Sequence, residues 1–121
     1  MRRVLLDHNV PEGVRSLLPG HDVATTWEMG WSRLANGALL TAAERAGFEV
    51  FVTGDRNIRF QQTLVGRQLA LIVLGTNVWP VVRNHGEEIA WAVSQVRPGA
   101  YLEVPIALPP RSPRRPKEPG L

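Results

Sequence analysis

The sequence predicts a three-layer α/β/α protein with a central, mainly parallel sheet. Apolar runs at 4–6, 50–52 and 69–74 are typical of strands buried on both faces. Segments with apolar residues at helical spacing separate most of these runs, and turns containing glycine or proline separate the elements. This alternation predicts βαβ units, whose crossovers are right-handed by default.

Five strands and three helices are predicted in chain order. The strands are predicted at 4–6, 21–25, 48–53, 69–74 and 101–106, and the helices at 11–18, 36–46 and 80–96. Pro11 suits the first position of the first helix. Pro105 cannot donate to a strand ladder, so the last strand is predicted to lie at an edge of the sheet. The polar segment 56–64 is predicted to be a loop with a helical turn.

The length indicates one domain, 1–108, followed by a flexible tail, 109–121. The tail holds five of the ten prolines, which predicts an extended chain. It also holds four basic residues and one acidic residue, so it accounts for the whole net charge of +3. The domain itself is neutral, and the basic pI therefore does not indicate a nucleic-acid-binding fold. The tail, in contrast, offers charge that suits a phosphate backbone.

The composition also narrows the chemistry and the compartment. The chain has no cysteine, which excludes disulfides, thiol nucleophiles and zinc–thiolate sites. No signal peptide and no stretch long enough to span a membrane is evident. A cytoplasmic protein without a membrane partner is therefore expected.

Two aspartates, Asp7 and Asp55, directly follow the first and third predicted strands. In a flavodoxin-like order, 2-1-3-4-5, these strands are neighbours, and ligands bind at their carboxyl ends. Two close carboxylates repel each other unless a cation lies between them. Mg²⁺ suits such a pair, because it prefers oxygen ligands and keeps several waters. The alternative is that each aspartate caps the helix or turn that follows it.

Further polar residues lie near these strand ends. Asn36 is predicted to be the N-cap of the 36–46 helix, which would point its amide toward the same rim and make it a third member of the catalytic group. The predicted substrate-binding residues are Asn9, Thr53, Arg56, Asn57 and Arg59. The arginines suit phosphate as bidentate donors. Turn chemistry and simple surface exposure are the alternatives for the asparagines and arginines.

The histidine and tryptophans each allow two interpretations. Strand alternation is expected to turn His8 away from Asp7 and into solvent, and a general base is the alternative. Trp27 and Trp31, in the loop 26–35, either stack on unpaired bases or cover the core or a dimer contact. Trp79 and Trp91 are assigned to packing.

An ordered series of motifs adds a family resemblance. The motifs are Leu5–Pro11, Gly20–Val23, Met29–Trp31, Asn36–Leu40 and Val52–Asn57. Together they resemble the small bacterial PIN-like proteins, which are stand-alone relatives of PIN-domain ribonucleases. The resemblance covers residues 2 to about 75, while the last helix and strand agree only in outline and the tail does not agree.

The resemblance implies a PIN-like α/β/α fold, acids at the strand ends that bind Mg²⁺ or Mn²⁺, and hydrolysis of RNA. It also implies the toxin of a toxin–antitoxin pair, with an antitoxin protein as partner and a homodimer as one option. Asp7 and Asp55 match the family's first and late acidic positions. Asn36 replaces a common acid and His8 a common glutamate, so one metal fits better than two about 4 Å apart.

Three other classes of protein share some of these features. A receiver domain needs paired acids after its first strand and a lysine after its fifth, but the only lysine is Lys117 in the tail. A haloacid-dehalogenase-type phosphatase needs a second aspartate where this chain has Asn9. A non-catalytic PIN-like module that binds RNA or a protein partner remains the main alternative, and metal binding that depends on Asp7 and Asp55 separates it from the nuclease.

Overall fold

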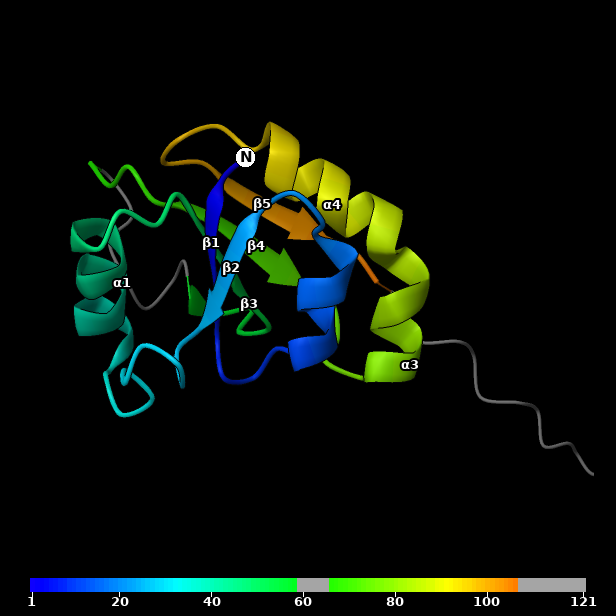
Figure 1. The fold of residues 1–121 in the computed structure, drawn as a ribbon, viewed down its shortest axis with the longest axis horizontal. Coiled ribbons are helices and arrows are strands. Elements are labelled where there is room, and N and C mark those ends of the chain that lie inside the picture. The colour runs from blue at the N-terminus through cyan, green and yellow to red at the C-terminus, as the bar shows by residue number, and fades with distance from the viewer. Residues whose placement is uncertain (59–65, 107–121) are drawn as a thin grey trace, which may run out of the picture.

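A computed structural model describes residues 1–58 and 66–106 (Figure 1). The predicted tail, Arg59 and most of the predicted loop 56–64 lie outside the described residues. The described chain forms a five-stranded parallel sheet in the order β2-β1-β3-β4-β5. Its strands are β1 Arg3–Leu6, β2 Asp22–Thr25, β3 Val50–Thr53, β4 Ala70–Leu74 and β5 Tyr101–Val104. The α/β class, the strand order and the edge position of the last strand are confirmed.

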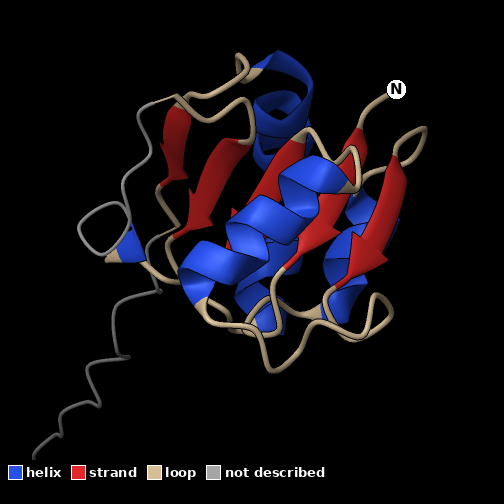
Figure 2. Cartoon of the chain, turned by 90° about the vertical axis from the view of Figure 1, so that its left-hand side faces the viewer, coloured by secondary structure: helices blue, strands red, loops and turns tan. Residues whose placement is uncertain are grey.

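The strand residues alternate between two apolar clusters, one on each face of the sheet. The first cluster contains Leu6, Val52 and Ile72, and the second contains Leu5, Phe51 and Leu71. Helix α1, Asn36–Arg45, packs against the second cluster, and it crosses the sheet in Figure 2. Residues of the helical segments 12–17, 79–82 and 86–95 pack against the first cluster. Because both faces are covered, β4 is apolar throughout, and β1 and β3 are apolar except at Arg3 and Thr53.

The predicted first helix is a short 3₁₀ helix, η1, Glu12–Leu17. Pro11 is its N-cap and not its first helical residue, so that prediction is wrong by one position. Gly13 in this helix lies under the ring of Trp79. A Cβ at this position would come within 2.6 Å of the indole, so the contact requires glycine. The assignment of Trp79 to packing is confirmed.

The predicted helix 80–96 is divided into three pieces: α3 Trp79–Val82, η2 Arg83–His85 and α4 Gly86–Gln95. At the junction, the Asn84 amide donates to the carbonyl of Pro80 at 3.2 Å, which competes with regular helix bonding. Trp91 on α4 is 64% exposed, so its assignment to packing is wrong. It lies two residues after the buried Ile89, about 200° around the helix.

Among the described residues, no helix combines the length and the apolar character that crossing a membrane would need.

Candidate functional site

Asp7 continues the line of β1 by one residue. Its N–H donates to the carbonyl of Val52 at 2.9 Å, and its carbonyl accepts from Val10 N–H at 3.0 Å, which closes the following turn. The carboxylate is only 4% exposed and accepts two strong hydrogen bonds. His8 N–H donates to Oδ1 at 2.8 Å, and the hydroxyl of Thr53 donates to Oδ2 at 2.8 Å. Asp7 is therefore held rigidly in the structure.

Thr53 connects the two aspartates. Its hydroxyl donates to Asp7 and at the same time accepts from the N–H of Asp55 at 3.1 Å. The side chain is fully buried, at the carboxyl end of β3. The register of the parallel strands, Leu6 beside Val52, places Asp7 beside Thr53. Asp7 and Asp55 thus belong to one hydrogen-bonded group at neighbouring strand ends.

Asp55 is half-buried and accepts from two sides. The N–H of Asn57 donates to Oδ1 at 2.9 Å, which is the Asx turn that the capping alternative predicts. The Asn36 amide donates to Oδ2 at 3.4 Å. The loop after β3 and the start of α1 therefore meet at this carboxylate.

Asn36 is not the N-cap of α1. Ala35 has that position, because its carbonyl accepts the first helical hydrogen bond, from Leu39 N–H at 2.7 Å. Asn36 is the first residue of the helix, and this offset turns its amide toward Asp55. The prediction that its amide faces the strand-end rim holds, although the capping role does not. In this geometry Asn36 positions Asp55.

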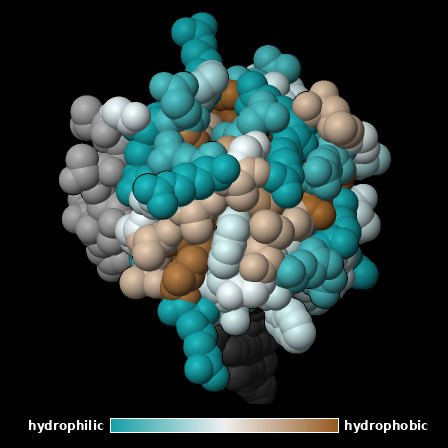
Figure 3. Space-filling view, turned by 60° about the vertical axis from the view of Figure 1, so that its left-hand side comes forward, coloured by the Kyte–Doolittle hydropathy of each residue, from teal (hydrophilic) through white to brown (hydrophobic). Residues whose placement is uncertain are grey.

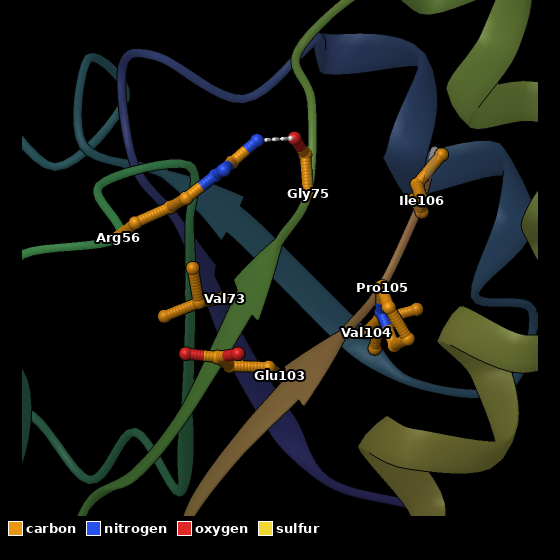
Figure 4. Close-up of a pocket in the computed structure, with 7 residues that line it drawn as sticks. All are labelled: Arg56, Val73, Gly75, Glu103, Val104, Pro105 and Ile106. Carbon is orange, nitrogen blue, oxygen red and sulfur yellow. Dashed lines mark hydrogen bonds between the residues drawn. The ribbon is translucent and has the colours of Figure 1, made fainter. Parts of the chain in front are cut away.

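Of the other predicted substrate-binding residues, the structure describes Asn9, Arg56 and Asn57, which follow the two aspartates in the chain. The side-chain oxygen of Asn9 accepts from Gly54 N–H at 2.9 Å and joins the two strand-end loops. The guanidinium of Arg56 donates to the carbonyl of Gly75 at 2.6 Å, beside a hollow of about 270 Å³ (Figure 4). Asn57 is exposed, and Arg59 lies outside the described residues.

His8 differs from expectation. Its side chain is 70% exposed, as predicted, but it is not turned away from Asp7. Nδ1 of the imidazole lies 2.9 Å from Oδ1 of Asp7. The regular strand ends at Leu6, so the alternation on which the prediction depended no longer applies at His8.

The charge of the site is not balanced by arginine or lysine. In the part of the chain that the structure describes, the only ion pair of either aspartate is the contact between Asp7 and His8. The same residues contain no group of three or more histidine, cysteine, aspartate or glutamate side chains that would surround a metal ion. The donor set is therefore two carboxylates without an arginine or lysine partner among the described residues.

Those donors suit one hard cation better than two. A carboxylate oxygen has two lone pairs. Within residues 1–58 and 66–106, Oδ2 of Asp7 accepts one bond, and each oxygen of Asp55 accepts one. Oxygen lone pairs from both carboxylates thus remain for an ion, and Mg²⁺ typically takes one or two carboxylates and fills its shell with water.

Searches of protein-family models, curated proteins and solved structures give no match for this chain. The PIN-like resemblance thus stays a prediction from the motifs, and the site is interpreted from its own chemistry.

Two features of the site were not predicted from the sequence. Thr53 was predicted to bind substrate, whereas the structure uses its hydroxyl to connect Asp7 and Asp55. The sequence signal for this linking role was a threonine two residues before Asp55. The contact between His8 and Asp7 had no comparable signal, because it depends on the backbone beyond the end of the strand.

Proposed function

We propose that this chain is a divalent-metal-dependent endoribonuclease of PIN-like type, with Mg²⁺ or Mn²⁺ held by Asp7 and Asp55. The observation that carries the proposal is the Thr53 hydroxyl, which joins the Asp7 carboxylate to the backbone N–H of Asp55 at the ends of adjacent parallel strands. Burying an aspartate costs free energy unless its charge is compensated. A cation between Asp7 and Asp55 would supply that compensation and give the pair a function.

Three side chains have distinct roles in this proposal. Asp7 and Asp55 hold the ion, and Asn36 orients Asp55 through its amide. When bound, the ion supplies charge stabilisation for the phosphate and lowers the pKa of water. In the hydrolysis, a water oxygen bonds to phosphorus, the bond to the leaving ribose oxygen breaks, and that oxygen gains a proton.

The experiment is cleavage of a mixture of single-stranded and structured RNAs by purified protein with millimolar Mn²⁺. Asp55→Asn should abolish cleavage while leaving the fold intact, because Asp55 is half-buried. Asp22→Asn is the matched control, since this exposed aspartate lies at the opposite, amino end of β2. Cleavage that persists in excess chelator, or equally in Asp55→Asn, would overturn the proposal.

Asp7→Asn is a less direct test than Asp55→Asn. Oδ1 and Oδ2 of Asp7 both accept hydrogen bonds, so an amide nitrogen would face one of those donors. An unmatched buried donor costs about 1–3 kcal/mol. Lost activity in Asp7→Asn should therefore be interpreted only with a measured free energy of unfolding.

The toxin assignment depends on the motif resemblance, and it adds an antitoxin as partner. Induced expression in bacteria should arrest growth, and Asp55→Asn should relieve the arrest. The non-catalytic alternative, a module that binds RNA or a protein, predicts RNA binding in chelator and no cleavage in Mn²⁺.

A further inference from the structure

The loop between β2 and α1, residues 26–35, is anchored to the candidate site at both ends. At its start, Thr26 N–H donates to the carbonyl of Leu6 at 3.0 Å, one residue before Asp7. At its end, Asn36 contacts Asp55. The loop lies at the carboxyl edge of the sheet, where it is drawn in cyan in Figure 1. The loop therefore begins and ends beside the strand ends that carry the two aspartates.

The first half of this loop is a closed turn. The Thr25 hydroxyl accepts from Glu28 N–H at 3.1 Å, and the Glu28 carboxylate accepts from Thr25 N–H at 3.0 Å. Arg15 on η1 forms an ion pair with the same carboxylate. Hydrogen bonds from Arg15 and from Thr25 lower the pKa of Glu28 below its usual value of 4.5. The turn is thus held both by its own hydrogen bonds and by the ion pair with Arg15.

Backbone bonds close the rest of the turn. Gly30 N–H donates to the carbonyl of Trp27 at 3.0 Å, and Trp31 N–H donates to Thr26 at 2.9 Å. Gly30 has a φ of +75°, which other residues rarely adopt. The backbone on both sides of Trp27 is therefore defined before any ligand binds.

The two tryptophans of the loop have opposite environments. Trp31 packs edge to face on Phe48, with ring centroids 6.0 Å apart, and belongs to the cluster under α1. Trp27 is 75% exposed. The sequence left both tryptophans with the same two interpretations. The structure assigns Trp31 to packing and presents Trp27 to solvent.

We infer that Trp27 is a stacking platform for an unpaired nucleobase of RNA whose phosphate lies at Asp7 and Asp55. The inference rests on the proposed function and adds the substrate class, which is single-stranded RNA or an RNA loop. A base can stack on an aromatic side chain only when it is unstacked from its own neighbours. A fixed turn lowers the entropy lost on binding, because the indole backbone is already ordered.

A partner protein fits this surface less well. The centre of a protein interface is typically a closely packed apolar area. On the side of the molecule that carries α1, hydrophilic residues interrupt the apolar ones (Figure 3). Glu28 and Arg33, in the same loop as Trp27, are exposed and charged. A single exposed ring in a loop with charged residues suits one stacked base better than the apolar centre of a protein interface.

The test is RNA binding in chelator, measured by the fluorescence anisotropy of a labelled single-stranded oligonucleotide and of its duplex. Trp27→Ala should weaken single-strand binding roughly 5- to 150-fold, which corresponds to one lost base stack. Trp27→Phe should keep most of the affinity, and duplex binding should not change. Trp91→Ala is the matched control, because Trp91 is also exposed but lies on α4.

The outcomes separate the stacking inference from the nuclease proposal. Wild-type protein that binds single strands through Trp27 but cleaves nothing in Mn²⁺ would support stacking and contradict the nuclease. Cleavage with equal single-strand affinity in wild type, Trp27→Ala and Trp91→Ala would overturn stacking alone. A change in oligomeric state without a change in RNA affinity would overturn it in favour of a protein contact.

A second readout does not depend on the stability of the alanine variant. Single-stranded oligonucleotide should quench the tryptophan fluorescence of wild type and of Trp91→Phe. The quenching should be lost in Trp27→Phe. Equal quenching in all three proteins would overturn the inference.

Discussion

Two carboxylate networks occupy opposite ends of the sheet, and they differ in how their charge is balanced. At the amino end of β4, Glu44 accepts from the Arg67 guanidinium at 2.7 Å and from Gln68 N–H at 2.8 Å. At the carboxyl ends of β1 and β3, Asp7 and Asp55 accept mainly from a hydroxyl, an amide and backbone N–H groups.

The difference separates a structural network from a candidate site. Burial alone would raise the pKa of Glu44, but the hydrogen bonds from Gln68 and Arg67 outweigh it and hold this pKa below 4.5. Glu44 therefore has its counter-ion inside the protein. Asp7 and Asp55 have no lysine or arginine partner among the residues described. The carboxyl-end network is the one that an external cation would complete.

Apart from loss of the aspartates themselves, the largest expected effect on cleavage comes from removing the group that orients Asp55. Asn36→Ala should lower RNA cleavage about 10- to 100-fold, which is typical for residues that orient metal ligands. Asn84→Ala should leave the rate unchanged, because the Asn84 amide contacts the carbonyl of Pro80 and neither aspartate. Equal rates for wild type and Asn36→Ala would mean that the amide contact has no role in the site.

Without metal, removing a carboxylate from each network should lower the free energy of unfolding by different amounts. Glu44→Ala should lower the free energy of unfolding by about 2 kcal/mol, because Arg67 and the N–H groups of Gln68 and Leu69 lose their acceptor. Asp55→Ala should cost less than about 1 kcal/mol, since its partners can reach water. Urea unfolding of both variants in chelator measures the contrast. A larger loss of unfolding free energy in Asp55→Ala than in Glu44→Ala would contradict this comparison.

The smallest effect is the pH dependence of the Glu44 network. A carboxyl whose pKa is lowered by folding stabilises the protein above its unfolded pKa, near 4.5, and this stability is lost as the pH falls through the lower folded value. The stability difference between wild type and Glu44→Gln should therefore shrink below about pH 4.5. Unfolding curves between pH 6 and pH 3 measure it, and a constant difference would argue against the ion pair.

The sequence predicted the features that depend on pattern. Apolar runs located the strands, and the β2-β1-β3 order placed Asp7 and Asp55 at one edge. The sequence did not predict two local features. The N-cap of α1 is Ala35, a poor capping residue, and not Asn36, which is a shift of one residue. The strand end at Leu6 was predicted, but not that the backbone beyond it turns His8 toward Asp7. No periodicity in the chain indicates either feature.

The most direct test of the cation site is Mn²⁺ binding measured by thermal unfolding and by calorimetry. Wild type should bind one ion per chain, and a hundredfold excess over the dissociation constant should stabilise it by about 2.7 kcal/mol. Glu44→Gln should respond in the same way, and Asp55→Asn should not respond. An unchanged wild-type melting temperature, or the same response in Asp55→Asn, would contradict a metal site at Asp7 and Asp55.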